Sequence, residues 1–282
     1  MSDSSHFKAQ LREGWNGAAV GWRLWAETLE VAAQGLSNRL VELAQVKEGD
    51  HVLDIGTGIG EPAITAARKV GPNGRVLGVD LSREMLAVAR ERAKAVQLQN
   101  IGFREGDIEN IILPSSHFNA VIARWSLMFL VNVHDFLVKV QKTMIPGARF
   151  AAAVWSEPAK VPVITVTTNA VASVLNQSLH TSGMPGPFAL SDSLALEQVF
   201  NKAGYRDVKS ERFEVTFQFK SARDYANYSQ SVSALARPML STKPADVQEQ
   251  AWNAVEKAAK QYESSTGSII MKNQAICVVG TR

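Results

Sequence analysis

The sequence predicts an α/β fold, with a mostly parallel β-sheet covered by helices on both faces. Between residues 51 and 155, short runs rich in β-branched residues alternate with helical runs, and this alternation is typical of βαβ units. A turn with three glycines follows the first of these strands. In open α/β sheets, ligands bind beyond the carboxyl ends of the strands, where such turns lie.

Most of the expected sheet comes from the first half of the chain. Residues 6–45 have helical spacing, and Ser82 is the expected N-cap of a later helix. Strands are expected at 51–56, 75–80, 101–107, 118–125 and 148–155, with helices at 61–71, 82–98 and 133–144.

The pattern changes after Trp155. A helix is expected at 194–205, one long strand or a strand pair at 206–219, and further helices within 221–262. The apolar run at 269–282 predicts a closing strand that returns to the first sheet.

We expect one compact domain built from three segments. Residues 1–45 are a predicted N-terminal helical cover, and residues 46–156 are the ligand-binding core. Residues 157–282 are predicted to supply a substrate-side insert with a helical lid, together with helices and closing strands of the same sheet. Turn signals in "SGMPGPF", residues 182–188, suggest part of that lid.

Composition narrows the class of protein. Thirty basic and 27 acidic residues give a net charge of +3, which is too small to favour a nucleic-acid partner. The one cysteine, Cys277, rules out a disulfide framework and a cysteine metal cluster, and no metal-ligand spacing is present. The polar N-terminus and the short apolar runs predict a cytoplasmic protein without stable membrane insertion.

The stretch "HVLDIGTGIGE" carries the main functional signal. Glycines at 56, 58 and 60 allow positive φ and let a ligand approach the backbone. The sixth position of the loop is Glu61, whereas nicotinamide sites favour a glycine there. Asp54 lies two residues before the loop, where a carboxylate would repel a pyrophosphate and suit a cofactor with positive charge. Asp80, at the end of the second strand, suits a ribose of either cofactor type.

These motifs resemble those of class I S-adenosylmethionine (SAM)-dependent methyltransferases. The matching stretches are "LDIGTGIG", "GVDLS" and "EGDIENI", in this order. Residues 118–155 are also similar to the ubiquinone/menaquinone C-methyltransferase (UbiE-like) family. The resemblance covers residues 50–156 well. It implies a Rossmann-like fold with a seven-stranded sheet, and SAM as the cofactor, with S-adenosylhomocysteine (SAH) as product.

The resemblance also implies a role for each cofactor residue. Asp54 would face the methionine part of SAM, and Asp80 would hold the ribose hydroxyls. Arg124 would meet the methionine carboxylate, with a surface or lid ion pair as the alternative. Asp107 would accept from the adenine amino group, with a turn cap as the alternative. The remaining predicted cofactor residues are Gly56, Thr57, Gly58, Leu81 and Ile108.

Aromatic residues suggest an apolar acceptor pocket. Its predicted lining residues are Trp22, Trp25, Trp125, Met128 and Trp155. The N-terminal tryptophans could instead simply pack their helix onto the protein, because aromatic stripes usually mean packing.

We expect methyl transfer to a small, largely apolar molecule by in-line displacement, with no catalytic residue assigned. Three alternatives remain open: a non-catalytic SAM-fold binding protein, a nicotinamide-dependent oxidoreductase, and an RNA-modifying enzyme. The oligomeric state and the methylated atom are not predicted.

Overall fold

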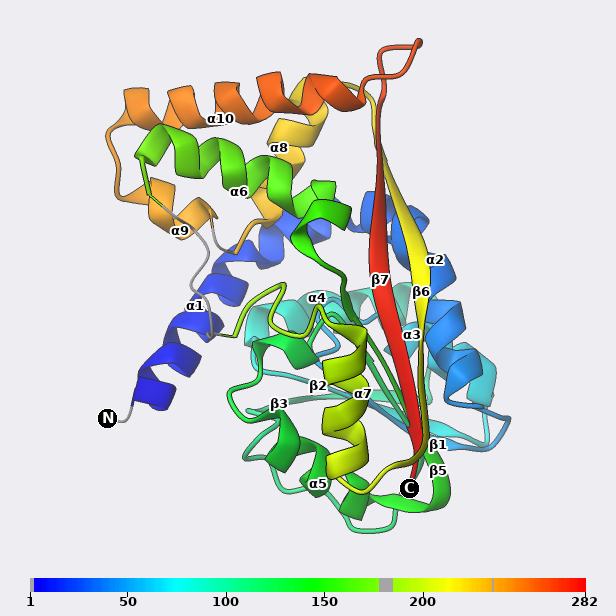
Figure 1. Ribbon diagram of the computed structural model, residues 1–282. Helices are drawn as coiled ribbons and strands as arrows, with labels where there is room; N and C mark the ends of the chain where they lie inside the picture. Colours follow the sequence, from blue (N-terminus) through cyan, green and yellow to red (C-terminus); the bar gives the residue numbers. More distant parts are fainter. Residues whose placement is uncertain (1–2, 178–184, 235) are drawn as a thin grey trace. The chain divides into compact units, whose positions relative to one another are not determined.

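The computed structural model describes residues 3–177, 185–234 and 236–282 (Figure 1). Two compact units emerge from the contacts. Unit 1 combines residues 1–33, 158–183 and 214–274, and unit 2 combines residues 34–157, 184–213 and 275–282. Part of the predicted lid turn, at 182–184, lies outside the described residues.

One seven-stranded sheet has the order β3-β2-β1-β4-β5-β7-β6. Strands β1 to β5 are parallel neighbours, and β7 pairs antiparallel with β5. The strands are β1 (His51–Ile55), β2 (Arg75–Asp80), β3 (Ile101–Glu105), β4 (Phe118–Arg124), β5 (Met144–Trp155), β6 (Arg206–Phe219) and β7 (Ile269–Thr281). The mostly parallel sheet is therefore confirmed. The segment 206–219 is one long strand, and the closing strand joins the first sheet as expected.

Helices connect the strands and fill unit 1. They are α1 (Asp3–Leu24), α2 (Ala26–Leu43), α3 (Ala63–Val70), α4 (Arg83–Ala95), α5 (Val133–Thr143), α6 (Pro162–Leu175), α7 (Ser193–Lys202), α8 (Ala222–Val232), α9 (Ala236–Ser241) and α10 (Ala245–Ala259). Helices α3 and α4 contact β2, whereas α5 contacts β5 and α7. From β1 the chain first adds strands on one side of the sheet (β2, β3) and then on the other (β4, β5). Because each crossover is right-handed, α3 and α4 cover one face of the sheet and α5 and α7 the opposite face, as Figure 1 shows.

Capping signals in the sequence explain where the helices of unit 2 begin and end. The Ser82 side chain accepts a hydrogen bond from the backbone N–H of Met85 at 3.1 Å, as predicted for an N-cap. Asn132 caps α5 in the same way, through the N–H of Asp135. Helix α3 ends at Gly71, which has φ of +66°, a conformation that glycine adopts without strain.

Unit 1 has a core of aromatic side chains from the α1 region, α8 and the end of β6. The ring of Trp25 meets Tyr228 edge-on at 5.6 Å, and the Trp22 indole donates to the carbonyl of Val232 at 3.1 Å. A side chain at Gly21 would overlap with the backbone of α8 at residue 231, so α1 and α8 approach closely there. Trp22 and Trp25 thus pack within their own unit, and their predicted contact with an acceptor stays a prediction.

No helix among the described residues is both long and apolar enough to cross a membrane. The predicted segment boundaries at residues 45 and 156 stay predictions.

Candidate cofactor site

Strand order reverses between β1 and β4, which are neighbours at the centre of the sheet. The carboxyl ends of strands at such a switch point form the usual ligand crevice of an open α/β sheet. The glycine loop follows β1. Arg124 is the last residue of β4, and Trp125 comes directly after it. Predicted cofactor residues from distant parts of unit 2 therefore meet at one edge of the sheet.

Asp54 is the most unusual residue at this edge, because its carboxylate is fully buried. One oxygen, Oδ2, accepts from the backbone N–H of Ala63 at 3.0 Å. The other oxygen, Oδ1, has no hydrogen-bond partner among the described residues. Burial raises the pKa of Asp54 to about 7, while the nearby Thr57 hydroxyl and Arg124 oppose this shift. The Thr57 hydroxyl lies near the Asp54 carboxylate, but the two do not form a hydrogen bond of ordinary geometry.

The glycine loop joins the ends of β1 and β2, because the N–H groups of Gly56 and Thr57 both donate to the carbonyl of Val79. Gly56 has φ of +67°, and a side chain there would overlap with Cβ of Ser126. The Ser126 hydroxyl in turn donates to the carbonyl of Ile55 at 2.6 Å. Gly58 has φ of +53°, and a Cβ built on it would meet nothing within 4 Å. The loop thus needs glycine at both positions, and it leaves open space beside Gly58.

Asp80 anchors this loop from the end of β2. Its Oδ2 accepts from the N–H of Gly58 at 2.8 Å, and its Oδ1 accepts from the N–H of Ser82 at 2.8 Å. Burial raises the pKa of Asp80, and these backbone bonds oppose the shift. The N–H of Leu81 also interacts with this carboxylate, and because two oxygens offer about four lone-pair sites, Asp80 keeps spare acceptor capacity for a ligand hydroxyl. Leu81, the next residue, is half-buried.

Asp107 and Ile108 follow β3 and are both half-buried. The Asp107 carboxylate accepts from the N–H of Glu109 at 3.0 Å and from Nδ2 of Asn110 at 2.6 Å. The N–H of Gly106 donates to the carbonyl of Asp80 at 2.9 Å, which joins the ends of β3 and β2. Asp107 therefore caps its own turn beside Asp80, and its contact with an adenine stays a prediction.

Arg124 ends β4 and points toward the acids of the loop. Its Nη1 donates to the hydroxyl of Ser37 in α2 at 2.7 Å. Burial lowers the pKa of the Arg124 guanidinium, while the carboxylates of Glu61 and Asp54 oppose the shift. Glu61 is itself buried and accepts from the Thr65 hydroxyl at 2.6 Å. In the sequence, Glu61 is notable only as the residue that stands where nicotinamide sites favour a glycine. No local signal predicts that its carboxylate interacts with Arg124 and Asp54.

Trp125 holds a strained position next to Arg124. Its φ is +57°, a left-handed conformation that bulky residues rarely adopt and that clusters at functional sites. The indole stacks on Trp155 with ring centres 4.2 Å apart and 18° between planes, and the Arg124 guanidinium lies 5.1 Å from the Trp125 ring centre. The Trp125 indole N–H is buried without a partner in the described structure. Trp155 and Met128 are themselves buried, and their predicted contact with an acceptor stays a prediction.

Together these groups suit a ligand with a cationic head and a pair of hydroxyls. A buried carboxylate oxygen without a partner is costly unless a donor meets it, and a ligand ammonium supplies such a donor. The open space at Gly58 lies beside Asp80, which has spare acceptor capacity for hydroxyls. SAM carries both groups, so the residues present fit it. Within the described ranges, no cluster of three or more histidine, cysteine or acidic residues could hold a metal ion.

Comparison with known proteins agrees with this geometry. The family model described as "Methyltransferase domain" matches residues 46–204. Two curated relatives are a demethylmenaquinone methyltransferase of Symbiobacterium thermophilum and a ubiquinone/menaquinone biosynthesis C-methyltransferase of Pseudomonas fluorescens. The first is 31% identical over 40% of this chain and 45% of its own length. The second is 29% identical over 62% of this chain and 66% of its own length. The matches thus span about half to two-thirds of these relatives.

Solved structures support the fold. A phosphoethanolamine N-methyltransferase of Haemonchus contortus, in complex with SAM, matches 88% of this chain and 52% of its own. The TM-score is 0.55 at 17% sequence identity, so this likeness concerns the Rossmann-like fold alone.

Proposed function

The chain belongs to the methyltransferase domain family, and on this premise we propose that it transfers a methyl group from SAM to a small, largely apolar acceptor. The observation that carries the proposal is the buried Asp54 carboxylate, whose Oδ1 has no partner in the described structure. This carboxylate lies at the switch point of the sheet and beside a loop that needs its glycines.

Bound SAM supplies an electrophilic methyl group on its sulfonium. The protein's own contribution is mainly to position the cofactor and to exclude water. Asp54 holds the ammonium of the methionine part, directly or through water, and Asp80 holds the ribose hydroxyls. Arg124, tied to Ser37 and facing Asp54 and Glu61, binds the methionine carboxylate. We assign no general base.

The acceptor is a small molecule, a proposal supported by the similarity to a demethylmenaquinone methyltransferase and a ubiquinone/menaquinone C-methyltransferase. We propose that Trp125 forms part of its pocket, because the residue follows β4 at the same edge as the glycine loop. Its unpartnered indole N–H is a donor for a polar atom of the acceptor. The proposed location of the protein is the cytoplasm.

Calorimetric titration tests the cofactor first. SAM, SAH, NADH and NADPH are titrated into the wild-type chain and into Asp80→Asn, with Asp246→Asn as the matched control on the exposed face of α10. We expect micromolar binding of SAM and SAH alone, at least tenfold weaker in Asp80→Asn and unchanged in the control. Binding of only a nicotinamide, or of none of the four, would overturn the proposal.

A second measurement separates an enzyme from a cofactor-binding protein. The chain is incubated with methyl-labelled SAM and a panel of small apolar acceptors bearing hydroxyl, amine or activated carbon groups. We expect label to transfer to at least one acceptor class. Tight binding of SAM with no transfer to any member would favour the non-catalytic alternative.

A further inference from the structure

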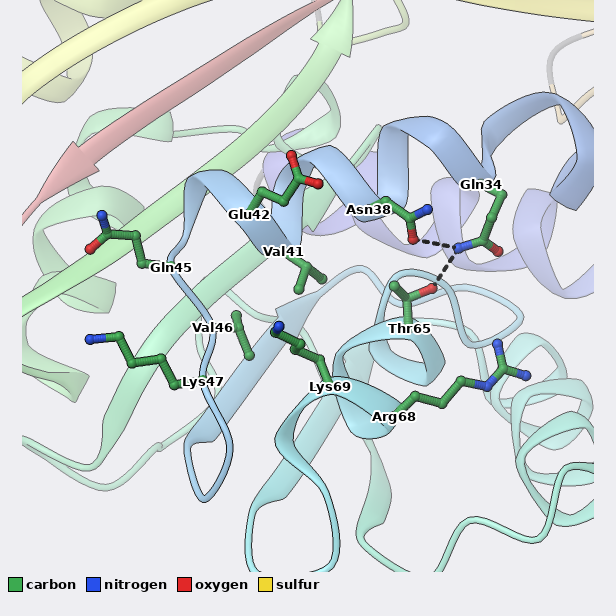
Figure 2. A pocket seen from close by; sticks show the side chains of 10 residues that line it. All are labelled: Gln34, Asn38, Val41, Glu42, Gln45, Val46, Lys47, Thr65, Arg68 and Lys69. Carbon is green, nitrogen blue, oxygen red and sulfur yellow. Dashed lines mark hydrogen bonds between the residues drawn. The ribbon is translucent and has the colours of Figure 1, made fainter.

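A groove lies between α2 and α3 in unit 2. Its volume is about 730 Å³, which is within the range of small-molecule sites. Figure 2 shows that its walls come from the second half of α2, the segment leading to β1, and α3. None of the residues proposed to hold SAM lines it, and Thr65 at one end of the groove donates its hydroxyl to Glu61 at 2.6 Å.

Three cations line this groove; in Figure 2 Lys69 points toward Val46, and Lys47 and Arg68 extend to opposite sides. Lys47 lies on the segment before β1, and Arg68 and Lys69 lie in the last turn of α3. All three are exposed, and none has an ion pair among the described residues. The one acid of the lining, Glu42, is already paired with Arg39 at 3.1 Å. The groove therefore has an excess of positive charge.

The position of Lys47 indicates that the positive charge of the groove is not explained by helix dipoles alone. Cations in the last turn of a helix are favoured by the helix dipole, which explains Arg68 and Lys69 without a ligand. Lys47 is on no helix, so that explanation does not cover it. Cations from separate segments around one concavity concentrate the positive potential there and attract an anion.

The floor and one end of the groove add further recognition. Val41 and Val46 are 5% and 4% exposed and form an apolar floor between the cations (Figure 2). At one end, Nε2 of Gln34 donates to the Thr65 hydroxyl at 2.9 Å and to Oδ1 of Asn38 at 3.0 Å. The bond to Thr65 links α2 to α3, and the bond to Asn38 lies within α2 and orients the Gln34 side chain.

We propose that this groove binds a small organic anion with at least two carboxylate or phosphate groups. The anionic groups pair with Lys47, Lys69 and Arg68, and the body of the ligand rests on the valine floor. Both kinds of group offer oxygens that accept from lysine and arginine, so the shared chemistry is an anionic oxygen. The site is separate from the proposed SAM site, and the inference does not depend on the proposed function.

Titration calorimetry with two probes tests this inference on the full chain. Pyrophosphate and citrate are titrated separately into the wild type, into Lys47→Gln/Lys69→Gln, and into Lys94→Gln/Lys202→Gln. The last variant removes the same charge from exposed positions on α4 and α7. Thermal unfolding shows that each variant is folded.

We expect one molecule to bind per chain with a submillimolar Kd, at least tenfold weaker in the groove variant and within twofold in the control. Binding of pyrophosphate alone identifies phosphate ligands, and binding of citrate alone identifies carboxylate ligands; either result supports the site. Absence of binding of both probes at millimolar concentration overturns the inference. An equal loss in both variants also overturns it, since the effect would then come from net charge.

Discussion

Replacing Asp54 with asparagine should change how the stability of the protein depends on pH. The carboxylate is fully buried, and its pKa is raised from 3.8 to about 7. Between these two pKa values, the carboxyl group is protonated in the folded protein and ionised in the unfolded chain. Stability therefore falls as pH rises from 3.8 toward 7, and it levels off above the folded pKa.

The size of the effect follows from the two pKa values. Integrating the proton difference between pH 5 and pH 8 gives a loss of roughly 3 kcal/mol for the wild type. The asparagine side chain of the variant cannot ionise, so the variant lacks this loss. The amide leaves one buried N–H₂ without a partner, which costs about 1–3 kcal/mol. That cost does not depend on pH, so the difference between the two proteins should drift by about 2–3 kcal/mol across this range.

Urea unfolding at pH 5, 6, 7 and 8 measures this drift. Wild type, Asp54→Asn and the exposed control Asp246→Asn are compared, because other titrating groups cancel in the differences. The free energy of unfolding of Asp54→Asn should improve relative to wild type as pH rises, and the control should run parallel to wild type. A constant difference between wild type and Asp54→Asn would show that Asp54 is already ionised at pH 5 and that burial does not raise its pKa.

Three further outcomes are expected. Gly56→Ala combines a φ of +67° with overlap at Ser126, so it should cost more than about 2 kcal/mol in urea unfolding. Gly147→Ala, with positive φ but open space, should cost only about 1 kcal/mol; equal losses would exclude the overlap. Ser82→Ala should cost about 1 kcal/mol and lower Tm by about 2–4 °C, whereas an unchanged Tm would mean that the cap is dispensable. Binding of SAM at pH 6 should release up to about one proton as Asp54 ionises; identical calorimetric enthalpies in buffers of different ionisation heat would contradict this.

Local signals were sufficient for most of the fold. Alternating apolar runs located β1 to β5, and the serine before α4 acts as the predicted cap. The segment 206–219 could be read as one strand or two, because its length and polarity suit both. In the structure this segment is the single strand β6, which pairs with β7. Such long-range pairing has no local signature in the sequence.

The site was less predictable than the fold. The motif residues Asp54 and Asp80 lie where the glycine loop requires them, since a strand and a tight turn fix their positions. One partner of Arg124 is Ser37, 87 residues away, and the docking of α2 brings the two together. Trp125 combines a left-handed backbone with a stack on Trp155, 30 residues away, and no local rule predicts φ above zero for a tryptophan.

The Trp125–Trp155 stack also has an optical consequence. Two indoles with centres 4.2 Å apart and planes 18° from parallel couple their electronic transitions, so the pair produces its own exciton bands in circular dichroism. The difference spectrum between wild type and Trp155→Phe isolates those bands from the other tryptophans. On the proposal that Trp125 lines the acceptor pocket, an acceptor that binds beside it would change these bands. Titration followed by circular dichroism would then detect that binding without a label and before any turnover is measured.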